Sequence, residues 1–375
     1  MNILFLNSID VATYGGMEEW IRLVAMGLKK RGHTVTVCGR PRSEFLRRLR
    51  GSLPDEDLCP VAVSADFHPG TIAHIRRLIQ ERRIDVVITN FNKDIRLGGL
   101  AARWTGKAKV IWSAGLDITR DKWVHRILTP RLLDGIIVPS AALKRQITRH
   151  GYLPPEMVEV IPIGLKDTKA HPELDRRFEL RERFGFTLDH VVAVTSGRFV
   201  EQKGHRYLLD AVPYIVAEHP EIRFLLLGDG PLRESLEAQI ARLDISEYVA
   251  LAGMLDSVDE VLAGADLMIH PSVEEPFGIA ILEGMRAGLP VVASDVGGIP
   301  EVVCTDTSAL LVPPREPKEL ARAVKHLLDW PDLMRYLGEG GRNRWEKLFN
   351  YETMIDRVEA NLARVRGQEE VHGPA

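Results

Sequence analysis

The segment LMIHPSVEEPFGIAILEGMRAGLPVVASD, residues 267–295, shows the architecture of the chain most clearly. It begins and ends with short, nearly continuous apolar runs, which are typical of parallel strands buried on both faces. Between them, Pro276 and Gly278 predict the start of a helix, and Gly288 followed by Pro290 predicts its end. Strand, helix and strand in this order indicate one βαβ unit of a parallel sheet.

The same alternation extends through all 375 residues. Six apolar runs occur in the first half (NILFLN, HTVTVCG, DVVITN, KVIWSA, GIIVPS and VEVIPIG) and six in the second (VVAVTSG, RFLLLGD, VALAG, LMIHPS, PVVASD and SALLVP). The length suggests two domains, and the alternation predicts that each is a doubly wound α/β domain. The polar segment 166–180 is the expected linker between them.

The composition is that of a soluble globular protein, with 45% hydrophobic and 27% charged residues. No apolar run approaches the length of a membrane-spanning helix, and the opening residues MNILFLNSID lack the features of a signal peptide. Cys38, Cys59 and Cys304 are scattered without metal-binding or redox spacing. These observations predict a cytoplasmic protein without a metal site or a cofactor.

The net charge of −3 conceals an excess of basic residues in the first 150 positions and of acidic residues in the remainder. A basic half predicts an anionic partner, such as a lipid surface or a phosphorylated acceptor. Two segments, 40–52 and 119–133, interleave Arg or Lys with apolar residues. Each is either a surface that lies on an anionic membrane or an ordinary helix docked on its own sheet. Nucleic acid is not expected, because no aromatic and basic platform accompanies the charge.

Residues for binding a diphosphate follow two of the expected strands. Arg198 and Lys203 lie in the loop SGRFVEQKGH, and two cations at the end of a strand can neutralise a diphosphate. The helix that follows the sequence EEPFG would present the backbone N–H groups of Phe277, Gly278 and Ile279 to an anion. Together these groups predict a diphosphate site that needs no metal ion.

Two carboxylates flank that helix start. Glu275 is expected in the loop before the helix and Glu283 about two turns into it, too far apart to share a proton. They suit the two ends of one elongated ligand, with Glu275 accepting a hydrogen bond from a sugar hydroxyl and Glu283 from a ribose. The alternative for Glu283 is a residue facing solvent. His270 is expected to be a hydrogen-bonded structural residue.

Other loops at strand ends contain small or polar residues. Glycines at three positions could let a ligand approach the backbone closely: Gly15, Gly16 and Gly228. The pair Gly297-Gly298 could do the same or could simply form a tight turn. A further polar loop follows the expected third strand and consists of Asn92, Lys93 and Asp94.

Taken together, these residues resemble glycosyltransferase family 4, the retaining family of the GT-B fold. The resemblance rests on Glu275-x7-Glu283 with PFG inside, combined with the Arg198 and Lys203 loop, and it extends over nearly the whole chain. It implies two Rossmann-like domains facing across a cleft. Residues 1–165 would bind the acceptor, with a C-terminal helix 351–367 packing back on them, and residues 176–350 would bind the donor.

The family also implies a role for each candidate residue. Glu275 would contact the donor sugar, Glu283 the ribose, and Gly16 would approach the donor from the first domain. Arg198 and Lys203 would hold the diphosphate. Asn92, Lys93 and Asp94 match a stretch on the acceptor side of lipopolysaccharide-type members.

One position departs from the family pattern. Many members have a His-Gly pair after the fourth strand, where this chain has Ala114 before Gly115. The expected activity is retaining transfer of a hexose, with UDP-hexose as preferred donor, to a saccharide or glycolipid in cell-envelope synthesis at the inner face of the cytoplasmic membrane. Two alternatives stay open: a sugar-nucleotide epimerase of the same fold, and a nucleotide-sugar-binding protein with weak or no activity.

Overall fold

The computed structural model describes residues 1–9, 14–63, 65–168, 174–255 and 257–367, and it contains two compact units. Unit 1 comprises Met1–Ile163 and the segment from Glu352 onward, and unit 2 comprises Gly164–Tyr351. The linker expected over 166–180 is wrong in its second part. Helix α7 (Leu174–Phe184) begins inside it, and Arg181 of this helix is buried and ion-paired with Asp266 at 2.6 Å.

Unit 1 is built on a sheet of seven parallel strands in the order β3-β2-β1-β4-β5-β6-β7. The strands are β1 (Asn2–Asn7), β2 (Thr34–Gly39), β3 (Leu58–Pro60), β4 (Val86–Thr89), β5 (Lys109–Ser113), β6 (Gly135–Val138) and β7 (Val158–Val160). All six strands expected in the first half are present. The edge strand β3 was not expected, because it has only three residues, none of them fully buried, and forms no apolar run.

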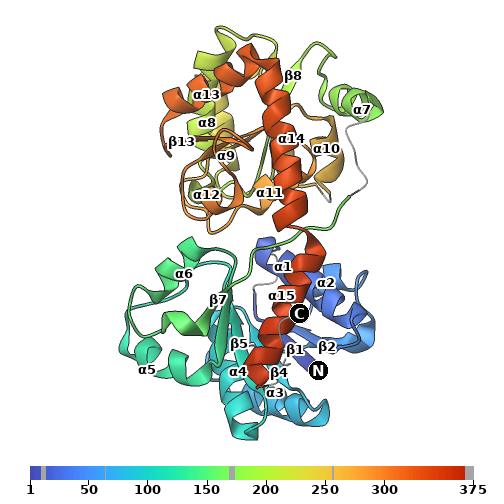
Figure 1. The fold of residues 1–375 in the computed structure, drawn as a ribbon, viewed down its shortest axis with the longest axis vertical. Coiled ribbons are helices and arrows are strands. Elements are labelled where there is room, and N and C mark those ends of the chain that lie inside the picture. The colour runs from blue at the N-terminus through green and yellow to red at the C-terminus, as the bar shows by residue number, and fades with distance from the viewer. Residues whose placement is uncertain (10–13, 64, 169–173, 256, 368–375) are drawn as a thin grey trace, which may run out of the picture. The chain divides into compact units, whose positions relative to one another are not determined.

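Helices lie around this sheet (Figure 1): α1 (Gly16–Lys30), α2 (Glu44–Leu49), α3 (Pro69–Glu81), α4 (Asn92–Thr105), α5 (Trp123–Leu132), α6 (Ala141–Thr148) and α15 (Tyr351–Arg366). The C-terminal helix α15 is held against the first helix by charge. Arg31, which ends α1, pairs with Asp356 at 2.6 Å and with Glu359 at 2.9 Å. His33 Nε2 lies 2.6 Å from the same Glu359 carboxylate.

Unit 2 has six parallel strands in the order β10-β9-β8-β11-β12-β13, and all six were expected. They are β8 (Val191–Ser196), β9 (Ile222–Leu227), β10 (Val249–Gly253), β11 (Leu267–His270), β12 (Val291–Ser294) and β13 (Leu310–Val312). The remaining helices are α8 (His205–Val216), α9 (Arg233–Arg242), α10 (Asp259–Gly264), α11 (Ile279–Arg286), α12 (Ile299–Val302), α13 (Pro317–Asp329) and α14 (Pro331–Leu348).

Each sheet has one topological switch point, where successive strands stop being added on one side of the sheet and start being added on the other. It lies between β1 and β4 in unit 1 and between β8 and β11 in unit 2. Ligands of doubly wound sheets bind beyond the carboxyl ends of the strands at this point, because the loops on either side leave toward opposite faces and open a crevice. The topology therefore directs attention to the loops that follow β8 and β11.

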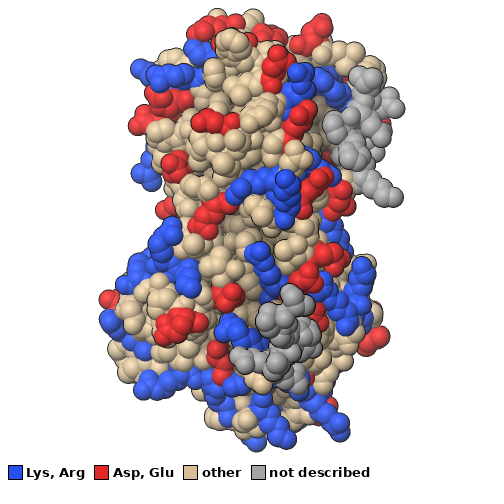
Figure 2. Space-filling model, in the orientation of Figure 1, with Lys and Arg blue, Asp and Glu red and all other residues tan. Residues whose placement is uncertain are grey.

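The two basic segments of unit 1 differ in what they bury. In α2, Phe45, Leu46 and Leu49 are all buried, so this segment is an ordinary helix docked on its own unit. In α5, Trp123 is 73% exposed and Ile127 one turn later is 44% exposed. On the face of unit 1 seen in Figure 2, the blue Lys and Arg side chains cover more of the visible surface than the red Asp and Glu side chains. Only the second segment therefore presents apolar side chains to an outside partner.

Candidate active site

Three loops beyond the carboxyl ends of β8, β11 and β12 are joined by backbone hydrogen bonds. A short 3-10 turn, Glu201–Lys203, follows β8, and its Gln202 carbonyl accepts the N–H groups of Val273 at 2.8 Å and Glu274 at 3.2 Å. The carbonyl of Glu275 accepts the N–H of Gly298 at 2.9 Å. These bonds hold together three loops that are far apart in the sequence. We call the edge that they form, residues 201–203, 273–275 and 298, the rim.

The glycine pair 297–298 has a packing role at this rim. Gly297 has a φ of +55°, and a Cβ there would lie 2.0 Å from the carbonyl oxygen of Glu275. A Cβ on Gly298 would lie 2.3 Å from the carbonyl oxygen of Pro276. A side chain at either position would displace the backbone that carries Glu275. The pair thus packs against the loop that carries Glu275. Lack of space for a side chain, and not only the formation of a tight turn, requires glycine at both positions.

Glu275 is buried, and three side chains converge on one of its carboxylate oxygens. The ammonium of Lys203 lies 2.6 Å from Oε2, and His270 Nε2 donates to it at 2.8 Å. The hydroxyl of Ser272 donates to the same oxygen at 3.4 Å and lies 3.0 Å from His270 Nε2. His270 is hydrogen-bonded as expected, but its partner is a candidate site residue, a function that sequence alone did not indicate.

The charge state of this cluster follows from its surroundings. Burial raises the pKa of the Glu275 carboxyl, but the nearby charge of Lys203 and the hydrogen bond from His270 outweigh it and lower that pKa to about 2. Burial lowers the pKa of His270, against the opposing effect of Glu275. At neutral pH the cluster therefore contains an ionised carboxylate, a neutral imidazole with its proton on Nε2, and an ammonium.

The other oxygen of Glu275 is open to a ligand. Within the described residues Oε1 has no hydrogen-bond partner, and it is not among the fully buried side-chain atoms that lack one. Since Lys203, His270 and Ser272 all bind Oε2, they fix the carboxylate and leave Oε1 available. This is the arrangement expected of an acceptor held ready for a hydroxyl group.

A second neutral histidine, His205, is electrostatically coupled to His270 and Lys203 of the cluster. His205, at the start of α8, is 2% exposed, and burial, followed by the effects of His270 and Lys203, lowers its pKa to about 3. Neither of its ring nitrogens has a partner in the described residues, nor has Nδ1 of His270. Positive charge at this rim is thus carried by Lys203 and by Arg198. Arg198 is exposed, and no carboxylate of the described residues pairs with it.

The start of α11 provides the uncapped helix end expected from sequence. Its N-cap is Gly278, with a φ of +113°, and no side chain caps the first N–H groups. Phe277 is buried against Phe349, with ring centroids 6.1 Å apart, so its backbone is held in place. Glu283 is the fifth residue of the helix, about one turn from its start rather than the expected two, and is partly exposed.

The candidate glycines have different surroundings. A Cβ on Gly228 would lie 2.1 Å from the carbonyl oxygen of Gly197, so packing between the β8 and β9 loops accounts for this glycine. Gly15 is the N-cap of α1 with an extended backbone, and Gly16 is the first residue of that helix. Their predicted contact with a donor stays a prediction.

Asn92, Lys93 and Asp94 were expected in a loop, but they form the first turn of α4, which follows β4 at the β1–β4 switch point of unit 1. Asp94 is fully buried, and its Oδ2 accepts the N–H of Phe91 at 3.0 Å. Burial raises the pKa of Asp94 to about 6, against hydrogen bonds that lower it. Its Oδ1 and the Oδ1 of Asn90 are buried without a partner in the described residues. Asn92 donates to the Ile118 carbonyl at 2.9 Å, and Lys93 is partly exposed.

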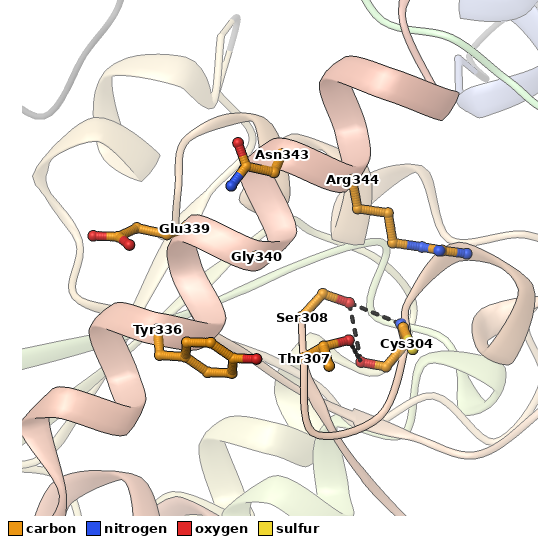
Figure 3. Close-up of a pocket in the computed structure, with 8 residues that line it drawn as sticks. All are labelled: Cys304, Thr307, Ser308, Tyr336, Glu339, Gly340, Asn343 and Arg344. Atoms are coloured by element: carbon orange, nitrogen blue, oxygen red, sulfur yellow. Dashed lines mark hydrogen bonds between the residues drawn. The ribbon is translucent and has the colours of Figure 1, made fainter.

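A separate hollow of about 370 Å³ lies elsewhere in unit 2, between α14 and the turn at 304–308 (Figure 3). Ser308 Oγ accepts the N–H of Cys304 at 2.7 Å, and Arg344 donates to the carbonyls of Glu301 and Val302, so their polar groups are already engaged. In Figure 3 Glu339 points away from the turn. This hollow contains none of the residues around Glu275 and no converging free charges.

Comparison with known proteins identifies the family. A model described as Glycosyl transferases group 1 matches residues 176–344, and one described as Glycosyltransferase Family 4 matches residues 14–169. The MMP alpha-(1->4)-mannosyltransferase of Mycolicibacterium hassiacum is 31% identical, over 97% of this chain and 99% of that protein. The chain belongs to glycosyltransferase family 4. The family expected from the motifs is thereby confirmed.

Other relatives match over part of their length. The alpha-D-kanosaminyltransferase of Streptomyces kanamyceticus is 30% identical over 58% of this chain and 57% of that enzyme. The chain spans about half the length, 51–57%, of the first curated relatives that it matches.

HepE of Anabaena, solved with UDP and glucose, has a TM-score of 0.84 at 22% identity and covers 96% of this chain and 99% of that chain. This confirms the expected GT-B fold.

Two further properties concern metals and membranes. Among the described residues, no group of three or more His, Cys, Asp or Glu side chains is placed to hold a metal ion. None of the helices over the described ranges is both long and apolar enough to cross a membrane.

Proposed function

We propose that this chain is a retaining hexosyltransferase that moves a hexose from a nucleotide diphosphate sugar, preferentially a UDP-hexose, to an acceptor hydroxyl. The observation that carries the proposal is the buried Glu275 carboxylate, fixed through one oxygen by Lys203, His270 and Ser272 beside the uncapped start of α11. Such a site can bind a sugar hydroxyl and a diphosphate next to each other.

The diphosphate would lie between the cations and the helix end. Lys203 contributes a point charge, and the exposed Arg198 contributes a fork of donors. The first N–H groups of α11 add the positive end of the helix dipole. These groups stabilise negative charge that grows on the leaving diphosphate, so the donor needs no metal ion there. Glu283, about one turn into α11, would accept hydrogen bonds from the ribose.

The reaction itself places few demands on the protein. Glu275 is ionised at neutral pH, so it orients the sugar through Oε1 and favours positive charge on the anomeric carbon. The acceptor hydroxyl attacks on the leaving-group face, its C–O bond forms as the sugar–phosphate bond breaks, and its proton passes to the departing phosphate oxygen. The competing route, a double displacement, requires a carboxylate next to the anomeric carbon.

The acceptor would be a saccharide or a glycolipid of cell-envelope or lipopolysaccharide synthesis, bound by unit 1. Asn92, Lys93 and Asp94 lie at the switch point of that unit, and the partly exposed Asn92 and Lys93 would contact the acceptor. Trp123 and Ile127 of α5, set among basic residues, would rest on an anionic membrane surface.

Calorimetric titration with UDP, GDP, ADP and their hexose conjugates, with and without Mg²⁺, tests the donor site. We expect one nucleotide to bind without metal, and Lys203→Met and Arg198→Met each to weaken it about 10- to 100-fold, the value of a charged hydrogen bond. Arg322→Met is the matched control, because Arg322 is an exposed arginine paired with Glu319 on α13. Equal weakening by all three variants would contradict the site.

Glu275→Gln then separates orientation from binding. It should depress hexose transfer much more than nucleotide affinity, because the amide can still accept a hydrogen bond but cannot stabilise positive charge. Equal losses in both would contradict the role of Glu275. Nucleotide binding without turnover on a broad acceptor panel would favour the alternative of a binding protein, for which Ala114 is the main argument. Conversion of the donor without any acceptor would favour the epimerase.

A further inference from the structure

Two of the three cysteines, scattered in sequence, lie opposite each other in the sheet of unit 1. Cys38 on β2 and Cys59 on β3 are register partners in the parallel pairing of these strands, and both are free thiols. Register partners point to the same face of a sheet, and neighbouring strands lie about 4.8 Å apart. That separation falls within the range of about 4.4–6.8 Å that a disulfide spans between Cα atoms.

The two thiols differ in access to solvent. Cys38 is fully buried, whereas Cys59 is partly exposed. Strand β3 is the edge strand of the sheet and has only three residues, so its backbone can adjust more easily than that of a central strand. A small reagent would therefore reach Cys59 first, with Cys38 directly behind it.

Positive charge and hydrogen bonding favour a thiolate on Cys59. Arg82 donates to Thr36 Oγ1 at 2.9 Å, and Thr36 lies two residues before Cys38 on β2, hence on the same face. The hydrogen bond from the Cys38 thiol, followed by His74 and Arg82, lowers the pKa of Cys59 to about 6 against the effect of burial. The same hydrogen bond, together with burial, raises the pKa of Cys38.

We propose that Cys38 and Cys59 form an oxidisable dithiol whose outer member, Cys59, reacts first with a peroxide and whose inner member, Cys38, closes a disulfide. In the first step the Cys59 thiolate attacks one peroxide oxygen, the O–O bond breaks, and the leaving hydroxide takes a proton to become water. In the second, the Cys38 sulfur attacks the Cys59 sulfenic acid, the S–O bond breaks, and the thiol proton leaves with the hydroxide as a second water.

The disulfide would join the edge strand β3 to β2. It would close the segment between them, which contains the whole of α2, into a covalent loop within unit 1. The modification site is independent of the proposed transferase activity, since neither cysteine belongs to the donor site. It requires only a peroxide as oxidant and a thiol reductant to reverse it.

The test uses the full chain treated with hydrogen peroxide, alkylated with N-ethylmaleimide and mapped by mass spectrometry. We expect a peptide pair joined through Cys38 and Cys59 that has lost two hydrogen atoms and is released by dithiothreitol. It should form equally in a Cys304→Ser background. A folded, peroxide-treated chain in which Cys59 accumulates as sulfinic acid without this cross-link would overturn the proposal.

Alkylation rates of the untreated protein provide a second measurement that needs no core substitution. At pH 7, Cys59 should react about 10-fold faster with iodoacetamide than Cys304, an exposed cysteine that serves as internal reference. His74→Ala should slow Cys59 and leave Cys304 unchanged. In Cys38→Ser, peroxide should leave a sulfenic acid on Cys59 that dimedone traps. Equal rates at Cys59 and Cys304 in the wild type would contradict an activated thiol.

Discussion

Replacing Glu275 by Gln should remove a specific part of the acid sensitivity of unit 2. The folded state lowers the pKa of Glu275 from 4.5 to about 2, so it favours the ionised carboxylate. The resulting stabilisation is complete above pH 4.5 and is lost as the pH falls through about 2. The difference between 4.5 and about 2 corresponds, at about 1.4 kcal/mol per pH unit, to about 3 kcal/mol. About 2 kcal/mol of this should disappear between pH 7 and pH 3.

Glutamine cannot titrate, so the wild type minus Glu275→Gln difference in unfolding free energy isolates this one group. Urea unfolding at pH 7, 5, 4 and 3, with pulse-labelled hydrogen exchange on peptides of β8 and β11, reports unit 2 separately from unit 1. The difference should shrink as the pH falls, most steeply below pH 4.5. If the wild type and the variant lose stability in parallel from pH 7 to pH 3, the assigned charge state of the cluster is wrong.

Glu44→Gln is the matched control. Hydrogen bonds from Arg47 and Arg48 also lower the pKa of Glu44 to about 2, but Arg47 is 67% exposed on the surface of α2. Salt screens such an exposed pair, whereas the buried Glu275 and Lys203 pair is largely shielded. In 1 M NaCl the pH-dependent effect of Glu44→Gln should therefore vanish, while that of Glu275→Gln should persist.

Three further perturbations have defined outcomes. His270→Leu removes a donor to the site carboxylate, so turnover should fall about 3- to 10-fold and the acidic limb of the pH–rate profile should move to higher pH, with little change in nucleotide affinity. Gly297→Ala should destabilise unit 2 and abolish turnover, because the new Cβ would clash with the loop that carries Glu275. Gly288→Ala is its control: Gly288 also has a positive φ, but a Cβ there would meet no atom within 4 Å, so the change should cost only about 1–2 kcal/mol of stability. Trp123→Ala should weaken co-sedimentation with anionic vesicles several-fold, and Trp330→Ala, which removes an equally large exposed side chain from unit 2, should leave it unchanged.

Much of the fold could be predicted from the sequence because its determinants are local. Buried parallel strands need unbroken apolar runs, and glycine and proline mark the turns, so twelve of the thirteen strands are visible as short segments. The exception, Leu58–Pro60, contributes too few apolar residues to be recognised. The helix start at Gly278 and the cationic loop with Lys203 were visible for the same reason, since each depends on adjacent residues.

Contacts between distant segments belong to the tertiary structure alone. The sequence specified that Glu275 precedes a helix, but the strand order placed Lys203 and His270 on a single oxygen of its carboxylate. It also brought Cys38 next to Cys59, although their spacing suggested no relation. Spacing along the chain predicts neighbours only within one helix or strand, whereas pairing of parallel strands aligns residues separated by whole crossover connections. For this reason the types of residue at the site could be read from the sequence, and their charge states and partners could not.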